Sequence, residues 1–171
     1  MSELGIYRME PSDLDEVLDI EKESFSLPWS RWMFERELEE KERSHFFVFK
    51  DGCEVLGYIG FWIVFDEAHI VTIAVRKDLR HKGIGTILMA SALIAAYKMG
   101  AQRATLEVRV TNTNAQKMYE KFGFETVSVR KRFYTDTGED AYVMWIHNLD
   151  DKIGEIRALG KKAEEKLLKS Y

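Results

Sequence analysis

The sequence predicts a single α/β domain in which a mixed, mostly antiparallel central sheet is flanked by helices. Segments rich in β-branched and aromatic residues alternate with stretches in which apolar residues recur every three or four positions. In addition, 171 residues with 46% hydrophobic content supply one ordinary hydrophobic core and are too few for two domains of usual size. We therefore expect one domain, without internal repeats, linkers or low-complexity segments.

The N-terminal part predicts a short strand and two helices. The strand is "GIYRM", and the pattern from Ser12 to Asp15 resembles a capping box that starts a helix near Pro11. Ser30 can cap a second helix that runs to about Glu40. Both helices then precede the strand-rich middle of the chain.

The remaining elements follow in a regular order. Three strands, "HFFVF", "VLGYIGFWIVF" and "HIVTIAV", form an antiparallel meander with a turn at Asp51-Gly52. A helix over 83–99, the strand "ATLEVRV" and a helix over 115–122 come next. The strands "TVSVRKRFY" and "EDAYVMWIHNL" then pair around a turn at 136–138.

The last segment predicts an amphipathic helix. Its apolar residues at helical spacing are Ile153, Ile156, Leu159, Ala163 and Leu167. We predict a domain over residues 1–149 and a helical extension over 150–171. The extension is a candidate surface for self-association or for a partner, and the sequence leaves the oligomeric state open.

Composition excludes several classes of function. A net charge of −4 argues against direct binding of nucleic acid, which needs a basic surface. No apolar run reaches the length of a membrane span and no signal-peptide pattern begins the chain, so we expect a cytoplasmic protein without membrane contact. The single cysteine, Cys53, and the histidines lack metal-ligand spacing, so we expect no metal.

The segment "RHKGIG" lies where the 83–99 helix begins. Helix N-termini have unpaired N–H groups and partial positive charge, so this position favours a phosphate. The other interpretation is a glycine turn with solvated cations. Neither a Walker loop nor G-x-G-x-x-G is present. The candidate anion-binding residues are Arg80, His81, Lys82, Gly83, Ile84, Gly85 and Thr86.

This segment matches the [Q/R]-x-x-G-x-[G/A] turn of the GNAT acetyltransferase superfamily. With "HIVTIAV" before it and "LEVRVTNTNAQKMYEKFGF" and "FYTDTGEDAYVM" after it, the chain resembles the Nα-acetyltransferases. These are the RimI ribosomal-protein alanine acetyltransferases and the archaeal and eukaryotic catalytic subunits. The likeness covers roughly Ile6 to Leu149. It implies the GNAT fold, acetyl-CoA as co-substrate, and acetyl transfer to the α-amino group of protein or peptide N-termini by direct attack in a ternary complex.

The strand "TLEVRV" carries the first candidate catalytic residue. Alternation places Leu106 and Val108 on one face and Glu107 and Arg109 on the other, so Glu107 can face a cleft. The resemblance implies that Glu107 is a general base that acts through a water molecule. The alternative is a Glu–Arg surface pair.

The resemblance implies further contacts to coenzyme A. Tyr119 would donate a proton to the thiolate, and Asn112 would contact the pantetheine arm, although Asn112 or Asn114 could equally cap a helix. His69 corresponds to a histidine that helps to move the proton in archaeal relatives, or it is structural. The backbone of Ile73, Ala74 and Val75 would bind the acetyl carbonyl and the pantetheine amides.

Two segments resemble the walls that hold a peptide N-terminus in the family. Their residues are Phe25, Leu27, Pro28, Trp29 and Tyr134. Trp29 stands where the eukaryotic and several archaeal enzymes have a glutamate, which leaves the acceptor preference open. The alternatives are a lysine side-chain or polyamine-type acetyltransferase and a noncatalytic acyl-CoA-binding subunit. A binder needs neither Glu107 nor Tyr119, and a polyamine enzyme would be expected to carry more acidic loops.

Overall fold

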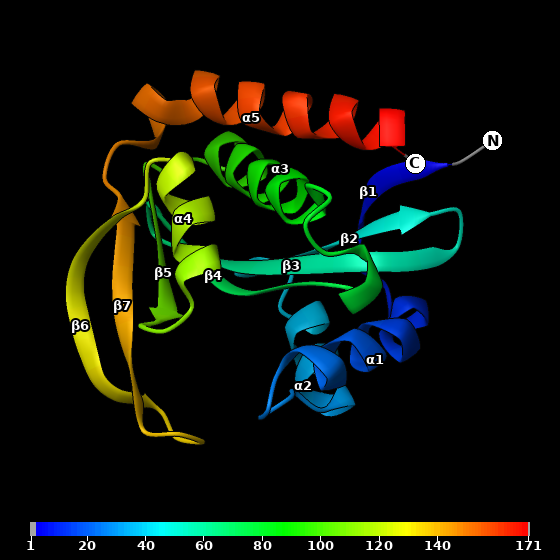
Figure 1. Ribbon diagram of the computed structural model, residues 1–171, viewed down its shortest axis with the longest axis horizontal. Helices are drawn as coiled ribbons and strands as arrows, with labels where there is room; N and C mark the ends of the chain where they lie inside the picture. Colours follow the sequence, from blue (N-terminus) through cyan, green and yellow to red (C-terminus); the bar gives the residue numbers. More distant parts are fainter. Residues whose placement is uncertain (1–2, 171) are drawn as a thin grey trace.

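Seven strands form one mixed sheet in the computed structural model, which describes residues 3–170 (Figure 1). The strands are β1 (Leu4–Arg8), β2 (Ser44–Asp51), β3 (Glu54–Val64), β4 (Glu67–Val75), β5 (Arg103–Arg109), β6 (Glu125–Tyr134) and β7 (Glu139–Ile146). Their order is β1-β2-β3-β4-β5-β7-β6, and only the β4–β5 pair is parallel. The predicted meander and the predicted mixed sheet are confirmed.

Helices cover both faces of this sheet. They are α1 (Leu14–Ser24), α2 (Arg31–Glu39), α3 (Ile84–Lys98), α4 (Thr113–Lys121) and α5 (Leu149–Ser170). In Figure 1, α1 and α2 lie below the sheet, whereas α3, α4 and α5 lie above it. No helix between residues 3 and 170 is long and apolar enough to cross a membrane.

The helix starts follow capping rules, with one correction. The Oγ of Ser30 accepts a hydrogen bond from the N–H of Met33 at 3.3 Å, as predicted for α2. Before α1, however, the carboxylate of Asp13 accepts the N–H of Glu10 at 2.9 Å. The predicted capping box of Ser12 and Asp15 is wrong because a 3-10 turn, Pro11–Asp13, precedes α1 and shifts the cap upstream.

The sheet separates two hydrophobic cores. The lower core joins α1, α2 and the sheet through residues such as Leu14, Phe34 and Tyr58. The upper core joins α3, α4 and α5 to the other face and includes Leu88 and Leu106. Side chains of successive strand residues therefore enter different cores, as expected for a sheet covered on both faces.

The C-terminal helix is part of the upper core. Leu149, Ile156 and Leu167 are fully buried there. Gly160 packs so closely on α3 that an added Cβ would lie 2.7 Å from the Cβ of Ala90. Leu159 and Ala163 pack against the same core, so most of the predicted apolar stripe is covered by the chain itself. Tyr171, the last residue of the predicted helix, lies outside the described residues.

Candidate active site

The sheet opens between β4 and β5. These parallel strands pair only where Glu67, Ala68 and His69 face Arg103, Ala104 and Thr105. Beyond that point β4 continues to Val75 and β5 to Arg109, each paired on its outer side with β3 or β7. The inner edge of β4 after His69 therefore presents backbone groups that have no strand partner within residues 3–170.

The predicted phosphate loop lies just after this free edge. Gly83 has a φ of +94° and is the N-cap of α3, whose first-turn amides have no partner inside the helix. Ile84 is buried, while Gly85 and Thr86 are half-buried. A Cβ on Gly85 would lie 3.5 Å from the Sδ of Met118 and 3.9 Å from Val75, so this glycine faces the space between α4 and β4.

The three basic residues of the loop have different surroundings. The Nε of Arg80 donates to the carbonyl of Val75 at 3.1 Å, and its Nη2 donates to the Oγ of Ser24 at 2.9 Å. Arg80 therefore fastens the loop to the end of β4 and to the end of α1. His81 and Lys82 are exposed beside it.

Glu107 lies at the opening with two partners. Its Oε2 is 2.7 Å from the Nε2 of His69, and its Oε1 is 3.7 Å from the Nη1 of Arg130. Arg109, the partner in the surface-pair alternative, binds other residues. Leu106 and Val108 are buried in the upper core, so Glu107 points to the opposite face, as the alternation predicted.

The surroundings of Glu107 favour its ionised form. Burial raises the pKa of this carboxyl group. The hydrogen bond and charge of His69, and then the charge of Arg130, lower the pKa by a larger total amount. The net effect is a pKa below the usual value for glutamate. At neutral pH the group is a carboxylate that can accept a proton.

Tyr119 approaches from the opposite side of the sheet. It is 7% exposed, belongs to the upper core and makes an edge-on contact with Phe124. Burial, with a smaller effect of nearby Tyr134, raises the pKa of its hydroxyl. Within the described part of the chain no side-chain or backbone group accepts a hydrogen bond from this hydroxyl, so its proton is available to a ligand.

The pantetheine candidates occupy the rim of the opening. Asn112 is the N-cap of α4, because its Oδ1 accepts the N–H of Ala115 at 3.2 Å; Asn114 lies within the helix. Ala74 is buried in the lower core, and Ile73 and Val75 pack against the upper one. Their side chains are thus engaged in the cores, while their backbone lies along the free edge.

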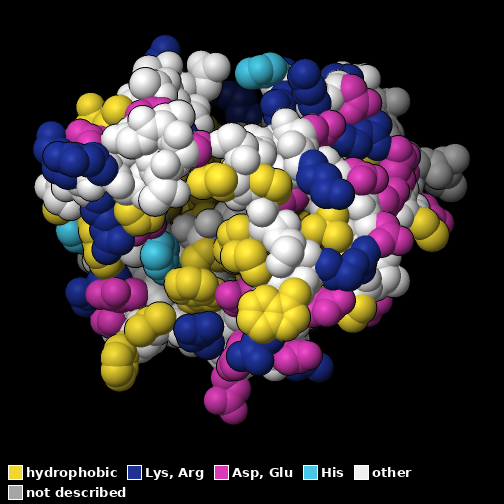
Figure 2. All heavy atoms as spheres, turned by 90° about the horizontal axis from the view of Figure 1, so that it is seen from below, with side chains coloured by type: hydrophobic (Ala, Val, Ile, Leu, Met, Phe, Trp, Pro, Cys, Tyr) yellow, Lys and Arg dark blue, Asp and Glu magenta, His cyan; other side chains and the backbone are white. Residues whose placement is uncertain are grey.

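The predicted acceptor residues of the first wall divide into two groups. Phe25, Leu27 and Pro28 are exposed. Trp29 packs on Phe34 with ring centroids 5.2 Å apart, so it is largely a core residue. Figure 2 shows hydrophobic side chains gathered near the middle of the face seen from below, with charged side chains around them.

A buried carboxylate, which the sequence analysis missed, holds this wall. Glu21 is 2% exposed and accepts hydrogen bonds from the N–H of Trp29 and the O–H of Tyr58. Burial raises its pKa, against the opposing effect of these two bonds. Helical spacing alone gave no reason to separate Glu21 from the other acidic residues of α1.

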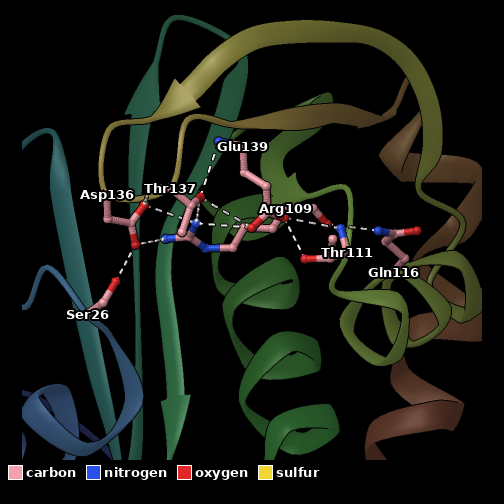
Figure 3. Close-up of polar contacts among 7 residues, drawn as sticks. All are labelled: Ser26, Arg109, Thr111, Gln116, Asp136, Thr137 and Glu139. Carbon is pink, nitrogen blue, oxygen red and sulfur yellow. Dashed lines mark hydrogen bonds and ion pairs between the residues drawn. The ribbon is translucent and has the colours of Figure 1, made fainter.

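The second wall is the turn between β6 and β7. Tyr134 is half-buried, and burial raises the pKa of its hydroxyl to about 12, so it remains protonated. The guanidinium carbon of Arg109 lies 4.0 Å from the centroid of its ring. Figure 3 shows that Arg109 also contacts Asp136, which in turn contacts Ser26 of the first wall.

Residues 14–124 match the model described as the acetyltransferase (GNAT) family. The chain belongs to this family. It is therefore a GNAT acetyltransferase, and the opening between β4 and β5, the glycine loop and the Glu107–His69 pair all lie within the matched segment.

Similar proteins support the same membership. A protein of Bacillus subtilis (strain 168) named "Putative ribosomal protein bS18-alanine N-acetyltransferase" is 40% identical over 142 residues, covering 83% of this chain and 94% of the relative. An "N-alpha-acetyltransferase" of Sulfurisphaera tokodaii is 35% identical, covering 78% and 86%. The crystal structure of the Escherichia coli ribosomal-protein-S18-alanine N-acetyltransferase is similar with a TM-score of 0.76 and 30% identity, covering 84% of this chain and 92% of that one.

Two features of this GNAT enzyme lie outside the matched segment. Helix α5 and the β6–β7 hairpin both follow residue 124, yet α5 packs on the loop helix α3 and the hairpin carries Tyr134. No group of three or more potential metal-ligating side chains occurs among residues 3–170.

Proposed function

We propose that this GNAT enzyme transfers the acetyl group of acetyl-CoA to the α-amino group of protein or peptide N-termini. The observation that carries the proposal is the position of Glu107, which binds His69 where the pairing of β4 and β5 ends, while Tyr119 lies on the opposite face of the sheet. The relatives are named as an alanine N-acetyltransferase of a ribosomal protein and as an N-alpha-acetyltransferase, and these names support the α-amino group as acceptor.

The described residues fit coenzyme A. Apart from the Val75 carbonyl, which Arg80 occupies, the free edge of β4 near Ile73–Val75 offers backbone groups that can bond to the amides of the pantetheine arm. At the end of this edge, the first-turn amides of α3 and the exposed His81 and Lys82 suit a pyrophosphate. Gly85 leaves room where a larger side chain would fill the space toward Met118.

In the reaction that we propose, the acceptor amine attacks the thioester carbonyl, so that a C–N bond forms and the C–S bond breaks. Glu107 takes the proton from the amine, directly or through one water molecule, and His69 holds the carboxylate in position. Backbone N–H groups near Ile73–Val75 stabilise the oxyanion that develops. Tyr119 donates its proton to the departing thiolate.

The chemistry of amines favours the α-amino group as acceptor. It titrates at about 7.7–8.0 and a lysine at about 10.4, so near neutral pH the neutral fraction of an α-amine is larger by roughly several hundred-fold. A base as weak as a carboxylate with a lowered pKa suits the first amine better than the second. The lysine and polyamine alternatives are therefore not favoured. A noncatalytic role is not favoured either, because a binding subunit would need neither Glu107 nor Tyr119.

A pair of peptides tests the proposal. One peptide has a free N-terminus and an internal lysine, and its twin is identical except for a blocked N-terminus. With acetyl-CoA, we expect mass spectrometry to show acetylation of the first nitrogen of the free peptide and almost none of the blocked twin. Equal rates for the two peptides would mean that the enzyme is a lysine acetyltransferase.

A further inference from the structure

We infer that Arg109 is a positioning residue for the acceptor: with Asp136 and Ser26 it joins the two walls of the acceptor site and fixes their separation. These three residues are called the entrance cluster below. The inference rests on the proposed function, because it assumes that a peptide N-terminus enters between residues 25–30 and the β6–β7 turn.

Arg109 holds the second wall by several contacts at once. Its Nη2 donates to Oδ2 of Asp136 at 2.8 Å and its Nη1 donates to Oδ1 at 3.1 Å, which is a bidentate pair (Figure 3). The same guanidinium lies over the ring of Tyr134, and its Nη1 is 3.5 Å from Glu139. The guanidinium therefore fixes the position of both the β6–β7 turn and the ring of Tyr134.

The cluster reaches the first wall through Ser26. The Oγ of Ser26 donates to Oδ2 of Asp136, although the two residues are 110 positions apart in the sequence. Asp136 thus accepts hydrogen bonds from both sides of the entrance. No other hydrogen bond or ion pair connects residues 25–30 with the β6–β7 turn within the described residues.

The backbone of Arg109 is held in place by β7 and by α4. Arg109 is the last residue of β5, two positions after Glu107 and on the same face. Its backbone pairs with Ala141 of β7, and its carbonyl accepts the side-chain amide of Gln116 at 2.9 Å. A displacement of the entrance cluster would therefore be transmitted directly to β5, the strand that carries Glu107.

The charges of the cluster keep it assembled across the pH range of an assay. The hydrogen bonds from Arg109 and then Ser26 lower the pKa of Asp136 to about 2. A carboxyl group with a lowered pKa keeps its bonds above its ordinary pKa and loses them only as the pH falls toward about 2. The entrance cluster is thus a fixed spacer and not a pH-dependent gate.

The chemical consequence is an entrance whose charged groups already have partners. The guanidinium of Arg109 contacts the carboxylates of both Asp136 and Glu139, so it is not free to bind a carboxylate of the acceptor. Tyr134, held under the guanidinium, keeps its protonated hydroxyl in one place, where it can donate to the backbone of an extended peptide. Loss of the cluster should therefore weaken acceptor binding and leave acetyl-CoA binding unchanged.

Steady-state kinetics of four variants test the inference: Ser26→Ala, Asp136→Asn, Arg109→Lys and Arg109→Met. We expect Asp136→Asn and both Arg109 variants to raise the KM for a peptide by about tenfold or more, with a smaller rise for Ser26→Ala. The KM for acetyl-CoA should stay within about twofold. Lysine should not rescue Arg109, because an ammonium group cannot form the bidentate pair.

The matched control is Asp140→Asn on the same hairpin. Asp140 binds Lys131 and the N–H of Arg132 but contacts neither Ser26 nor Arg109, so its loss should leave the peptide KM near the wild-type value. Hydrogen exchange of the free enzyme gives a readout that needs no substrate. The amides of residues 25–30 and 135–138 should exchange faster together in Asp136→Asn and Ser26→Ala, and not in the control.

Unchanged peptide KM values in folded Asp136→Asn and Arg109 variants would overturn the inference, as would unchanged exchange in both segments. Equal rises of both KM values would also overturn it, because they would indicate a general structural role. If the wild type acetylates no peptide N-terminus, the proposed function fails, and the exchange experiment still decides whether the cluster joins the walls.

Discussion

Glu107 and His69 meet at the last point where β4 and β5 are still paired. His69 pairs with Thr105 across the strands, and the next residues on either strand diverge. The side chain of Glu107 therefore lies at the apex of the opening, where burial is partial and a hydrogen-bond partner is fixed. We therefore expect the Glu107 carboxylate to lie close to any carbonyl group that binds along the free edge of β4.

Removal of either proton-transfer group should abolish most turnover without unfolding the protein. We expect Glu107→Gln and Tyr119→Phe each to lower kcat by roughly 10²–10⁴-fold, the range for a positioned acid or base. Calorimetry should give wild-type affinity for acetyl-CoA in both variants. Glu120→Gln, an exposed change on α4, is the control, and near-normal kcat in both site variants would disprove these roles.

The pH dependence has a definite sign. Because the pKa of Glu107 is lowered, this carboxylate stays ionised as the pH falls from 8 to 5. The rate over that interval should then follow the neutral fraction of the acceptor α-amine, which decreases steadily as the pH falls below about 7.7–8.0.

The sequence predicted these residues well where a local rule applied. Alternation along one strand was enough to place Glu107 opposite Leu106 and Val108. Alternation could not predict that Arg109 binds Asp136 and that Glu107 lies near Arg130. Both partners belong to the β6–β7 hairpin, whose position relative to β5 depends on the whole sheet. The roles proposed for the site residues remain predictions.

At the scale of elements, the glycine loop is defined by a backbone conformation. Gly83 has a φ of +94°, and His81 before it also has a positive φ of 65°. Gly100, in the turn after α3, has a nearly equal φ of +100° but lies in open surroundings. The chain thus contains a matched pair of glycines, one in the site and one outside it.

This pair separates backbone strain from ligand binding. We expect Gly83→Ala and Gly100→Ala each to lower the free energy of unfolding by about 1–2 kcal/mol, the cost of a left-handed residue with a Cβ. Only Gly83→Ala should weaken acetyl-CoA binding, because only there does the loop amide geometry matter. Calorimetric titration that gave the same affinity for both variants would contradict the assignment of the loop.

Element positions were more predictable than the contacts between loops. Periodic apolar residues placed α3 and α5, and turn residues placed the β6–β7 hairpin. The cap of α1 was misplaced by two residues because Glu10 and Asp13 form the capping box around the 3-10 turn that precedes the helix. The bond between Ser26 and Asp136 has no signal in the sequence, since it depends on how two distant loops meet in space.

At the scale of the whole molecule, α5 packs against the glycine loop at the start of α3. In Figure 1 it lies along α3. A Cβ on Gly83 would lie 3.5 Å from the Cβ of Ala163, so the helix forms the rear side of the loop. The extension is thereby part of what keeps the loop in place.

Two glycines of α5 test this packing. Gly154 has no neighbour within 4 Å, so Gly154→Ala should raise the free energy of unfolding by about 0.5–1 kcal/mol through helix propensity. Gly160→Ala gains the same propensity but collides with Ala90, and we expect a net loss of about 1–3 kcal/mol. Denaturant titration measures both, and equal stabilisation by the two changes would show that α5 is not tightly packed.

The opening between β4 and β5 also has a mechanical meaning. Strands β1 to β4 form one continuously bonded plate and β5, β7 and β6 form a second, and the backbone bonds between the plates cover only three residues of each strand. We expect such a sheet to bend more easily along that seam, so that the angle between the plates can change. An amide-containing ligand along the seam would bridge the plates, so each catalytic cycle should alternate between a softer free enzyme and a stiffer loaded one.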